Sequence, residues 1–420
     1  MKLLVVGSGG REHAVIRKLK ENKEIEKIYC APGNGGISAD AECVDIKATD
    51  KENMVKFAKE NAIDFCVVTP DDPLALGMVD EMEEAGIPCF GPKANAAIIE
   101  ASKAFSKDLM KKYGIPTADY ETFDNEKDAL HYIEEKNTFP IVIKADGLAL
   151  GKGVLICETL DDAKTALREM MVEHVFGLSG NKVVVEEFMT GKEVSVLAFT
   201  NGNVVKPMIS SMDHKRAYDN DEGLNTGGMG TIAPSPYYTK EIAETCMETI
   251  FLPTVKAMNA EGRTFKGCLY FGLMLTPRGP RVVEYNCRFG DPETQVVLPL
   301  LNSDLLTIMK ACHDGTLKDV DVVWSEEACA CVVEASGGYP VKYEKGFEIH
   351  GLDENGQHDG VIVYHAGTKK ENGKFYTNGG RVLGITAKGA TLQDALDKAY
   401  EAVKEIGFDK MHYRTDIGKK

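Results

Sequence analysis

Hydrophobic positions in the first hundred residues form short runs separated by amphipathic stretches. The runs predict strands, and the 3.6-residue periodicity between them predicts helices. The predicted strands cover residues 2–6, 27–30, 64–69 and 88–90, and the predicted helices cover 11–22, 51–61 and 74–85. Strands that alternate with helices indicate right-handed crossovers and a parallel sheet. Each polar turn here follows a strand, so we expect these turns to line the carboxyl edge of the sheet, where ligands bind.

From residue 102 onward the pattern mixes strands and helices in the manner of an α+β unit. Helices are predicted at 103–113 and 160–172, and strands at 141–144, 153–157, 182–188 and 193–200. Residues 213–236 are polar and rich in glycine, which predicts a long loop. Loops of that length are usually functional or disordered.

The last part of the chain, residues 328–420, is strand-rich with glycine turns, and a final helix is predicted at 392–406. The predicted fold class is therefore multidomain, α/β and α+β. We expect an N-terminal α/β domain with a parallel sheet at 1–101, a central domain at 102–325 and a small strand-rich C-terminal domain at 326–420. A chain of 420 residues is long enough for about two to four domains.

The composition is that of an ordinary globular protein, with 43% hydrophobic and 27% charged residues. The net charge of −16 argues against nonspecific binding to nucleic acid or anionic membranes, although a local basic cleft is compatible with it. No apolar run approaches the ~20 residues of a membrane span, and the N-terminus lacks the pattern of a signal peptide. The 11 cysteines are scattered without a C-x-x-C pair, which favours a reduced cytosolic chain over disulfides or zinc.

The most informative segment lies near residue 284, where a carboxylate, an amide and a guanidinium alternate along a predicted strand. Side chains alternate along a strand with period two, so Glu284, Asn286 and Arg288 are expected on one face. Carboxylate and amide oxygens are the hard ligands that Mg²⁺ requires. A guanidinium can form a two-pronged contact with a carboxylate or phosphate. The alternative is a polar edge strand with a solvated ion pair.

The turn Gly7-Ser8-Gly9-Gly10 follows the first strand and opens a helix, an arrangement that suits an anion. A dinucleotide fingerprint requires glycine at position 12, where this chain has Glu12. The turn therefore favours a phosphate over a nicotinamide cofactor. A purely structural glycine turn is the alternative.

A second glycine-rich segment joins the predicted strand that ends at Lys144 to the strand that follows Gly153. Glycines at 147, 151 and 153 allow the backbone to approach phosphates closely, and Lys144 and Lys152 supply compact positive charges. The spacing is not that of a P-loop, and a strand follows instead of a helix. A hairpin lid over a triphosphate is the favoured interpretation, and a merely flexible hairpin is the alternative.

Three other segments carry weaker signals. The strand that ends in Glu186 and Glu187 has an edge suited to adenine and ribose. The segments 211–216 and 226–230 are denser in polar residues than an idle loop usually is. His13 and His350 have no evident partner, so solvation or a core hydrogen bond is assigned to each.

Together these pieces follow the order of the ATP-grasp superfamily: Lys103, Lys144 with its glycine loop, Glu186-Glu187, and Glu284-x-Asn286-x-Arg288. More narrowly, the whole chain resembles the glycinamide ribonucleotide synthetase family. The shared motifs are Gly9–Ala14, Ala31–Asn34, Phe90–Pro92, Ser102–Phe105, Asp213–Arg216, Asn225–Gly230, Asn286–Gln295 and Thr377–Val382. The chain departs from the usual family pattern at Thr69 and Asp71, which flank Pro70 where glycine and glutamate are common.

The resemblance implies an ATP-grasp fold for the central domain and an ATP-dependent ligase. The implied reaction joins glycine to 5-phosphoribosylamine through glycyl phosphate, giving glycinamide ribonucleotide, ADP and phosphate in purine synthesis. It further implies Mg²⁺ or Mn²⁺ as cofactor and a cytoplasmic enzyme with small-molecule partners, without nucleic acid or membrane. A monomer is the default expectation, since the sequence does not determine an oligomeric state.

The resemblance also implies the site residues. Those expected to bind ATP are Lys103, Lys144, Gly151, Lys152, Gly153, Glu186, Glu187, Phe188 and Glu193. Those expected to bind the other substrates are Gly9, Gly10, Asn34, Pro70, Asp71, Asp213, Lys215, Gly228 and Arg288. Glu284 and Asn286 are expected to hold the metal, and Lys144, Asp213 and Arg288 to act in catalysis.

Two alternatives stay open at this point. A carboxylating or formylating purine enzyme would share the ATP site but not the segments 213–216 and 286–295. A dinucleotide-dependent oxidoreductase would explain the first glycine turn but none of the central domain.

Overall fold

The structure, a computed structural model, describes residues 1–148 and 153–419 of the chain. The predicted lid residues Gly151 and Lys152 lie outside these described ranges.

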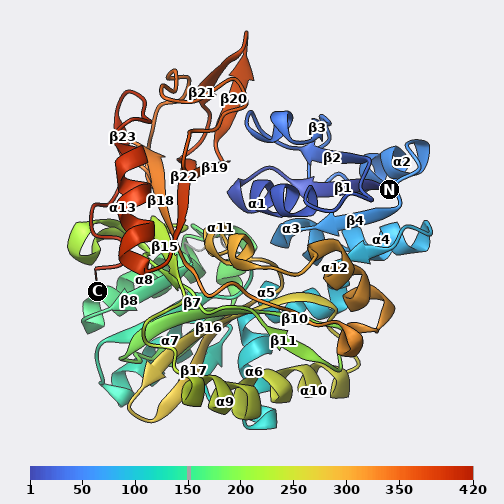
Figure 1. Cartoon of the computed structure of the whole chain (residues 1–420). Helices are drawn as coiled ribbons and strands as arrows, with labels where there is room; N and C mark the ends of the chain where they lie inside the picture. The colour runs from blue at the N-terminus through green and yellow to red at the C-terminus, as the bar shows by residue number, and fades with distance from the viewer. Residues whose placement is uncertain (149–152, 420) are drawn as a thin grey trace.

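The first hundred residues fold around a five-stranded sheet of order β3-β2-β1-β4-β5, in which all paired neighbours are parallel. Figure 1 shows it in blue at the upper right. The strands are β1 (Lys2–Gly7), β2 (Lys27–Pro32), β3 (Glu42–Cys43), β4 (Phe65–Val68) and β5 (Cys89–Phe90). The helices are α1 (Gly10–Leu19), α2 (Lys51–Glu60), α3 (Asp71–Ala75), α4 (Met78–Glu84) and α5 (Ala94–Ala101). The predicted parallel sheet is confirmed.

The single helix predicted at 74–85 is wrong, because the chain forms two helices there. α3 starts at Asp71 and ends at Ala75, and α4 starts at Met78. Between them, Gly77 takes a left-handed conformation with φ +89°, which glycine adopts without a Cβ clash. The apolar periodicity continues across this break, so the pattern alone hides it.

The middle of the chain forms two antiparallel four-stranded sheets, of order β6-β9-β7-β8 and β11-β10-β16-β17. Figure 1 shows strands of both in the lower half of the molecule. The strands of the first are β6 (Tyr120–Phe123), β7 (Ile141–Ala145), β8 (Val154–Cys157) and β9 (Val183–Glu187). Those of the second are β10 (Lys192–Thr200), β11 (Val205–Pro207), β16 (Gly267–Thr276) and β17 (Gly279–Asn286).

Helices flank these sheets. They are α6 (Lys103–Tyr113), α7 (Glu126–Lys136), α8 (Leu160–Leu167), α9 (Lys240–Cys246), α10 (Leu252–Ala260), α11 (Thr294–Val297) and α12 (Leu305–Asp314). The Ser102 hydroxyl caps the start of α6 by accepting a hydrogen bond from the N–H of Phe105 at 3.0 Å. A π-helical segment continues α8 to Val172, so the helix predicted at 160–172 is confirmed in extent.

The last part of the chain builds most of a six-stranded sheet with the path β12-β15-β18-β22-β19, and β23 pairs with β18. Its strands are β12 (Met212–Asp213), β15 (Gly230–Ala233), β18 (Ala328–Ser336), β19 (Ile362–His365), β22 (Arg381–Gly389) and β23 (Met411–His412). Helix α13 (Leu392–Val403) packs on β18 and β22. The hairpin of β20 (Thr368–Glu371) and β21 (Lys374–Thr377) projects at the top of Figure 1.

The long loop predicted at 213–236 is wrong, because much of this segment is strand. β13 (Arg216–Tyr218) and β14 (Glu222–Asn225) form a hairpin, and β15 is fully buried against β18. These strands are two to four residues long, which is too short for an alternating pattern to stand out. One consequence is that β12 and β15, from the middle of the chain, complete the C-terminal sheet.

One hydrophobic core runs through all three parts of the chain. It joins Leu3 of β1, Phe199 of β10, Phe289 after β17 and Cys329 of β18. The first sheet is therefore packed directly against the central and C-terminal elements. The predicted multidomain α/β and α+β fold class is confirmed. No helix within residues 1–148 and 153–419 has the length and apolar character needed to cross a membrane.

A buried polar contact also ties α1 to the C-terminal sheet. Nε2 of His13 lies 2.9 Å from a carboxylate oxygen of Asp40, and Nδ1 of His13 accepts the backbone N–H of His365 at 2.9 Å. Burial lowers the pKa of His13 below its ordinary value, although Asp40 opposes the shift. Of the two assignments for His13, a core hydrogen bond is the correct one.

Candidate active site

Strand β17 carries the polar side chains near residue 284 on one face. Glu284 and Asn286 are partly exposed, whereas Tyr285 and Cys287 between and after them are buried in the core. Arg288 follows on the partly exposed side. The predicted period-two alternation is therefore confirmed.

Glu100, at the end of α5, connects two of these side chains. One of its carboxylate oxygens accepts a hydrogen bond from Nδ2 of Asn286 at 2.9 Å and lies 3.1 Å from the guanidinium of Arg288. The other oxygen accepts the Cys287 N–H at 2.7 Å. Burial raises the pKa of the Glu100 carboxyl, although the charge of Arg288 opposes the shift. Nothing in the sequence singles out Glu100, because its partners lie on a distant strand.

Glu284 and Asn286 fit the partial coordination shell of a divalent ion. Burial opposes ionisation of Glu284, but the charges of Lys215 and Lys144 hold the pKa of its carboxyl below the ordinary value. Nδ2 of Asn286 donates a hydrogen bond to Glu100. The side-chain carbonyl oxygen of Asn286 is therefore left as a potential metal ligand. Within the described ranges, no group of three or more His, Cys, Asp or Glu side chains is placed to hold a metal ion. The two residues would therefore need further ligands from a bound phosphate or water.

Two buried lysines form ion pairs with the same carboxylate, Glu186 of β9. Lys144 lies 3.0 Å and Lys107 lies 3.2 Å from different oxygens of Glu186. Lys144 also donates to the carbonyl of Val283 at 3.1 Å, which brings it beside β17. Burial lowers the pKa of Lys107 to about 8, although Glu186 opposes the shift. Lys107 is absent from the predicted site, because a lysine in an amphipathic helix normally indicates a solvated face.

The described part of the lid region lies near Lys103. Nζ of Lys103 donates to the carbonyl of Gly147 at 2.8 Å, and burial lowers the pKa of this lysine. Gly153 is buried, and its carbonyl accepts a main-chain hydrogen bond from the end of β7 at 2.8 Å. The lid roles assigned to these residues stay predictions.

The residues predicted to bind adenine and ribose lie at the end of β9 and the start of β10. Glu187 accepts a hydrogen bond from the guanidinium of Arg278 at 3.0 Å, and Phe188 is 38% exposed. A carboxylate oxygen of Glu193 lies 3.7 Å from Nζ of Lys215. Lys215 lies a similar 3.6 Å from Glu284, so Glu193 and the metal-ligand candidate share one cation. The charge of Glu193 is the main cause of the raised pKa of Lys215.

The carboxylate of Asp213, at the end of β12, is influenced by the charge of a second carboxylate, Glu293. Burial and the charge of Glu293 raise the pKa of the Asp213 carboxyl well above its ordinary value. Glu293 is buried and lies within hydrogen-bond distance of Tyr270 at 3.2 Å and of Ser195 at 3.4 Å. A cation held near both carboxylates would reduce this electrostatic repulsion. Tyr270 and Ser195 are further candidate site residues that the sequence pattern does not reveal, whereas Glu293 lies within the motif Asn286–Gln295.

The Gly228 turn packs tightly on Asp213. A Cβ at Gly228 would lie 2.5 Å from Pro292 and 2.7 Å from an oxygen of Asp213, and its φ is +122°. Arg381 of β22 holds this turn from the C-terminal side, donating to the carbonyls of Gly228 at 3.4 Å and Asp291 at 3.0 Å. Glycine is therefore required at 228 by both space and backbone conformation.

At the first glycine turn, one of the N–H groups predicted to bind phosphate already donates a hydrogen bond within the chain. The Gly9 N–H donates to a carboxylate oxygen of Glu12 at 2.6 Å, which caps α1. A Cβ at Gly10 would lie 2.7 Å from Nε2 of Gln295. The turn thus meets residues that follow β17, and its role in phosphate binding stays a prediction.

Asn34 links the same turn to its surroundings. Its amide nitrogen donates to the carbonyls of Ser8 at 2.9 Å and His365 at 2.8 Å, and its amide oxygen accepts the N–H groups of Gly36 and Ile37, each at 3.0 Å. The hydrogen-bonding capacity of the amide is thus engaged within the chain. Any substrate contact of Asn34 is left as a prediction.

Pro70 and Asp71 stand at the start of α3, on the edge of the first sheet that faces the central elements. Burial lowers the pKa of Arg288, but the charge of Glu100, with a smaller contribution from Asp71, raises it above its ordinary value. Burial is the main cause of the raised pKa of Glu100, and the charge of Asp71 adds to it. Thr69 is buried and donates its hydroxyl proton to the carbonyl of Val6 at 2.6 Å, which gives it a role in the sheet.

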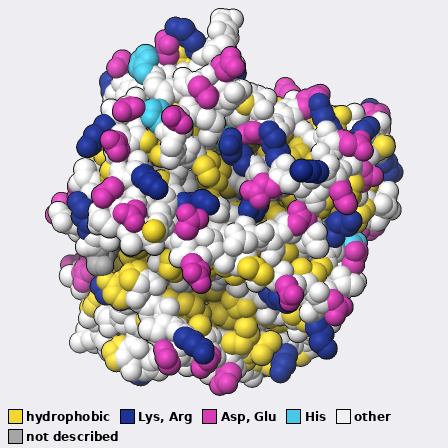
Figure 2. Space-filling view, in the orientation of Figure 1, with side chains coloured by type: hydrophobic (Ala, Val, Ile, Leu, Met, Phe, Trp, Pro, Cys, Tyr) yellow, Lys and Arg dark blue, Asp and Glu magenta, His cyan; other side chains and the backbone are white. Residues whose placement is uncertain are grey.

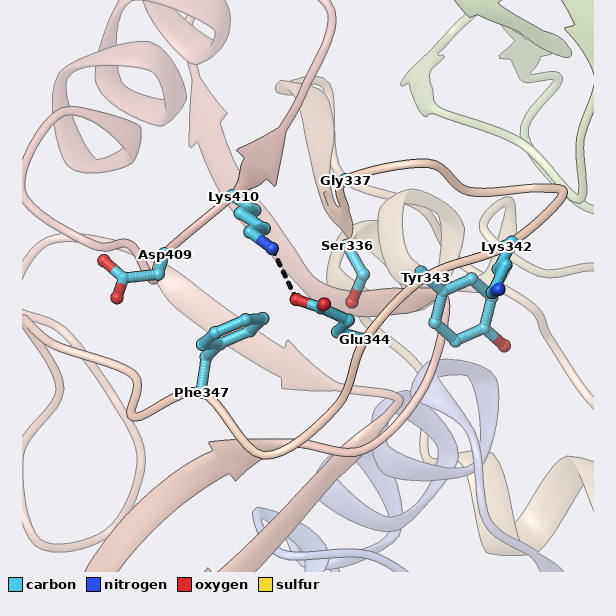
Figure 3. A pocket seen from close by; sticks show the side chains of 8 residues that line it. All are labelled: Ser336, Gly337, Lys342, Tyr343, Glu344, Phe347, Asp409 and Lys410. Atoms are coloured by element: carbon cyan, nitrogen blue, oxygen red, sulfur yellow. Dashed lines mark hydrogen bonds and ion pairs between the residues drawn. The ribbon is translucent and has the colours of Figure 1, made fainter.

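The visible face of the molecule carries both charged side chains and a hydrophobic hollow. Figure 2 shows acidic and basic side chains interspersed over the visible face, with hydrophobic side chains gathered in a hollow of the lower half, where Figure 1 places β7 and β16. A separate pocket of about 280 Å³ lies in the C-terminal part, beside the ion pair of Lys410 with Glu344 at 2.5 Å (Figure 3). None of the predicted site residues lines that pocket.

The comparisons with known proteins agree with this arrangement along the chain. Residues 1–100 match the phosphoribosylglycinamide synthetase N domain, residues 101–294 its ATP-grasp (A) domain and residues 329–420 its C domain. The chain belongs to the phosphoribosylglycinamide synthetase family. A relative from Caldanaerobacter subterraneus, named phosphoribosylamine–glycine ligase, is 49% identical over 417 residues, which cover 99% of both chains.

Solved structures of similar fold include another synthetase and a more distant ATP-grasp protein. The phosphoribosylamine–glycine ligase of Thermotoga maritima has a TM-score of 0.87 at 32% identity and covers 99% of this chain and 100% of that one. The biotin carboxylase domain of Hydrogenobacter thermophilus 2-oxoglutarate carboxylase, in complex with MgADP and bicarbonate, has a TM-score of 0.74 at 17% identity, covering 98% and 91%. The second likeness shows the fold alone.

Proposed function

We propose that the protein joins glycine to 5-phosphoribosylamine at the expense of ATP, releasing ADP, phosphate and glycinamide ribonucleotide in purine biosynthesis. The observation that carries this proposal is the synthetase family match over all three parts of the chain. The named relatives of similar length agree with it.

Glycine fits between Arg288 and the carboxylate pair of Asp213 and Glu293. Nε of Arg288 is buried and has no hydrogen-bond partner among the described residues, so it can receive an incoming carboxylate. Burial and the charge of Glu293 raise the pKa of Asp213, and a substrate ammonium near both carboxylates would relieve their repulsion. This placement assigns the glycine carboxylate to Arg288 and its ammonium group to Asp213, with Glu293 as a second partner.

The chemistry requires activation, because oxide is not displaced from a carboxylate by an amine at neutral pH. A glycine carboxylate oxygen attacks the γ-phosphorus of ATP, and the bond to the ADP oxygen breaks. The amine of phosphoribosylamine then attacks the acyl carbon of glycyl phosphate. Phosphate leaves with the glycine oxygen and takes up the proton that the amine loses. No protein nucleophile is required, so catalysis consists of positioning and electrostatic stabilisation.

Residues on β7 and β17 supply that stabilisation. Lys144 places positive charge beside β17, and Arg288 aligns the attacking carboxylate. A divalent ion held by Glu284 and Asn286 would neutralise charge on the transferred phosphoryl group. The lid residues Gly151, Lys152 and Gly153, with Glu186, Glu187, Phe188 and Glu193 at the nucleotide end, complete the proposed ATP site. Phosphoribosylamine is placed at the edge of the first sheet, near Gly9, Gly10, Asn34, Pro70 and Asp71.

Several further features belong to the proposal. They are domains at 1–101, 102–325 and 326–420, a cytoplasmic and monomeric enzyme, and use of Mg²⁺ or Mn²⁺. The MgADP named in the biotin carboxylase structure supports a divalent ion in this fold without distinguishing the two metals.

The decisive test is ADP release by the purified protein with ATP and Mg²⁺. Release is expected only when both glycine and phosphoribosylamine are present, the latter formed in place from ribose 5-phosphate and ammonia. Bicarbonate and formate, offered in place of glycine, test for a carboxylating or formylating enzyme. A shift of the melting temperature by a nicotinamide cofactor would revive the oxidoreductase alternative. ADP release with bicarbonate alone would overturn the proposal.

The order of bond making is tested with glycine that carries ¹⁸O in its carboxylate. One labelled oxygen should appear in the released phosphate at each turnover, because the attacking oxygen stays with phosphorus when the amide forms. Mass spectrometry of the phosphate measures this transfer. Unlabelled phosphate would mean that ATP activates another group, and the glycyl phosphate step would be abandoned.

A further inference from the structure

Three buried charged side chains form a triad between α6, β9 and β7. Lys107 lies 3.2 Å from one carboxylate oxygen of Glu186, and Lys144 lies 3.0 Å from the other. Lys107, Glu186 and Lys144 are 2%, 3% and 5% exposed. The triad therefore holds two positive charges and one negative charge where little water screens them.

Both lysines of the triad are also tied to β17. Nζ of Lys107 donates to the hydroxyl of Thr117 at 2.7 Å, and that hydroxyl donates to the carbonyl of Val282 at 2.7 Å. Nζ of Lys144 donates to the next carbonyl along the strand, that of Val283, at 3.1 Å. These second partners are uncharged, so they orient the ammonium groups without neutralising them.

The charge of Lys144 extends beyond the triad toward the proposed ATP site. Its partner Val283 precedes Glu284, and the charges of Lys215 and Lys144 lower the pKa of the Glu284 carboxyl against the effect of burial. A pair of Lys144 with Glu186 alone would be neutral, so the carboxylate would cancel much of this field. Lys107, on the other oxygen of Glu186, leaves the triad with a net positive charge.

Lys107 keeps its own charge in this position. Burial lowers its pKa to about 8, although Glu186 opposes the shift, so the ammonium is mostly protonated at pH 7. The charge of Arg281 also acts on Lys107, but Arg281 lies 3.7 Å from a carboxylate of its own, Glu187. A buried group of ions with unbalanced charge is costly unless a counter-charge is supplied. The phosphates of ATP are the counter-charge that the proposed site receives.

We propose that Lys107 is a positioning residue for the triphosphate, because it offsets the charge of Glu186 and leaves Lys144 with an uncompensated positive charge toward the phosphates of ATP. The inference rests on the proposed ATP site and deepens it. Lys107 touches no ligand in this scheme and acts through Glu186 and Lys144. Its effect should therefore grow with the number of phosphates on the nucleotide.

The test is calorimetric titration of Lys107→Met, in the full chain at pH 7, with AMP, ADP and ATP. EDTA is present so that no metal ion contributes to binding. Methionine keeps the buried aliphatic stem and removes the charge. The dissociation constant of the variant relative to wild type should rise from about twofold for AMP to about tenfold for ATP, with ADP between them. A residue that only shapes the nucleotide site would weaken all three ligands by the same factor.

Two further variants separate the charge of Lys107 from its hydrogen bond. Lys107→Gln removes the charge but keeps an N–H donor for Thr117, so it should show the same dependence on phosphate number. Lys107→Arg keeps a positive charge beside Glu186 and should bring ATP affinity back to within about threefold of wild type. Lys111→Met, at an exposed position one turn further along α6, is the matched control and should change none of the three affinities. The melting temperature of each variant confirms that it is folded.

Equal weakening of AMP, ADP and ATP by the methionine and glutamine variants would overturn the inference, as would unchanged affinity for all three. The proposed function fails in a different way. In that event the wild-type protein would bind ATP but release no ADP with glycine and phosphoribosylamine. A wild-type protein that binds none of the nucleotides would overturn both.

Discussion

Glu334 is a buried carboxylate without a hydrogen-bond partner among the described residues. It lies on β18 with 0% exposure, and both of its carboxylate oxygens lack such a partner. Burial raises the pKa of this carboxyl well above its ordinary value. The group is therefore protonated in the folded chain at pH values where it is ionised in the unfolded one.

The sign of the pH effect follows from that difference. The contribution of Glu334 to stability is fully present below the unfolded pKa of about 4.3 and is lost as pH rises toward the folded value. Replacing Glu334 with leucine should remove this loss. The free energy of unfolding of Glu334→Leu, relative to wild type, should therefore grow by about 1.4 kcal/mol for each pH unit between about pH 5 and the folded pKa of Glu334, and level off above it.

Urea unfolding at pH 5, 6 and 7 measures the trend. Glu326→Gln, at an exposed position just before β18, is the control and should follow the wild-type pH dependence. A constant difference between Glu334→Leu and wild type at the three pH values would show that the carboxyl finds a partner or water in solution.

Sequence patterns predict well where side chains lie when neighbours in the chain are also neighbours in space. Glu284, Asn286 and Arg288 are found from strand alternation alone, because the strand places every second side chain on one face. Glu100 and Gln295 cannot be found that way. The partners of Glu100 come from a distant strand, and a glutamate in a helix is chemically ordinary until the fold brings those partners close. Gln295 bonds to Asp291 only four residues earlier, yet the pattern does not show that its side chain is buried.

At the scale of elements, the apolar runs predict most strands because a buried strand needs several consecutive hydrophobic residues. β1, β7, β9 and β10 are therefore found near their true bounds. The failures have local causes. One glycine with positive φ splits α3 from α4, and the strands between residues 212 and 233 are too short to display a period.

Such patterns do not predict the topology of the C-terminal sheet. Hydrophobicity predicts that a strand is buried but not which strand lies beside it. β15 pairs with β18 across almost a hundred residues of intervening chain, and this pairing becomes evident only in the structure. The glycines of residues 226–230 predict a tight turn, and the structure has one at Gly228. They do not predict which strands lie beside this segment.

At the scale of the whole molecule, the first and last parts of the chain are joined through close backbone approach. A Cβ on Gly36 would lie 2.0–2.5 Å from ring and Cβ atoms of His365, and the Gly35 N–H donates to the carbonyl of Thr368 at 3.0 Å. His365 is itself buried, with Nε2 at 2.7 Å from the carbonyl of Gly356. There is thus no room for a side chain at Gly36.

Gly36→Ala should therefore destabilise the contact between α1, β2 and the C-terminal sheet. Overpacking of this kind costs about 1–3 kcal/mol, which thermal unfolding detects readily. Cleavage by a protease in the region of β19–β20 should also become faster, because the contact opens more often. Gly407→Ala is the control, since its added Cβ would meet only Met411 at 3.5 Å and its φ is not in the left-handed region.

A melting temperature for Gly36→Ala equal to that of Gly407→Ala would contradict this account. It would show that the two parts of the chain separate at no cost in solution.

The strand exchange in the C-terminal sheet has a consequence for biosynthesis on the ribosome. β12 and β15 lie in the middle of the chain and pair with each other, yet β15 gains its second partner only once β18 has been made. The contacts of the β13–β14 hairpin are completed later still. Arg414, near the end of the chain, donates to the carbonyl of Arg216 at 3.1 Å and to the carboxylate of Asp221 at 3.1 Å. The nascent chain can complete its first sheet early, but the segment that carries Asp213 and Gly228 stays unfinished until translation is almost over. The segment that we propose to bind glycine is therefore completed last during synthesis.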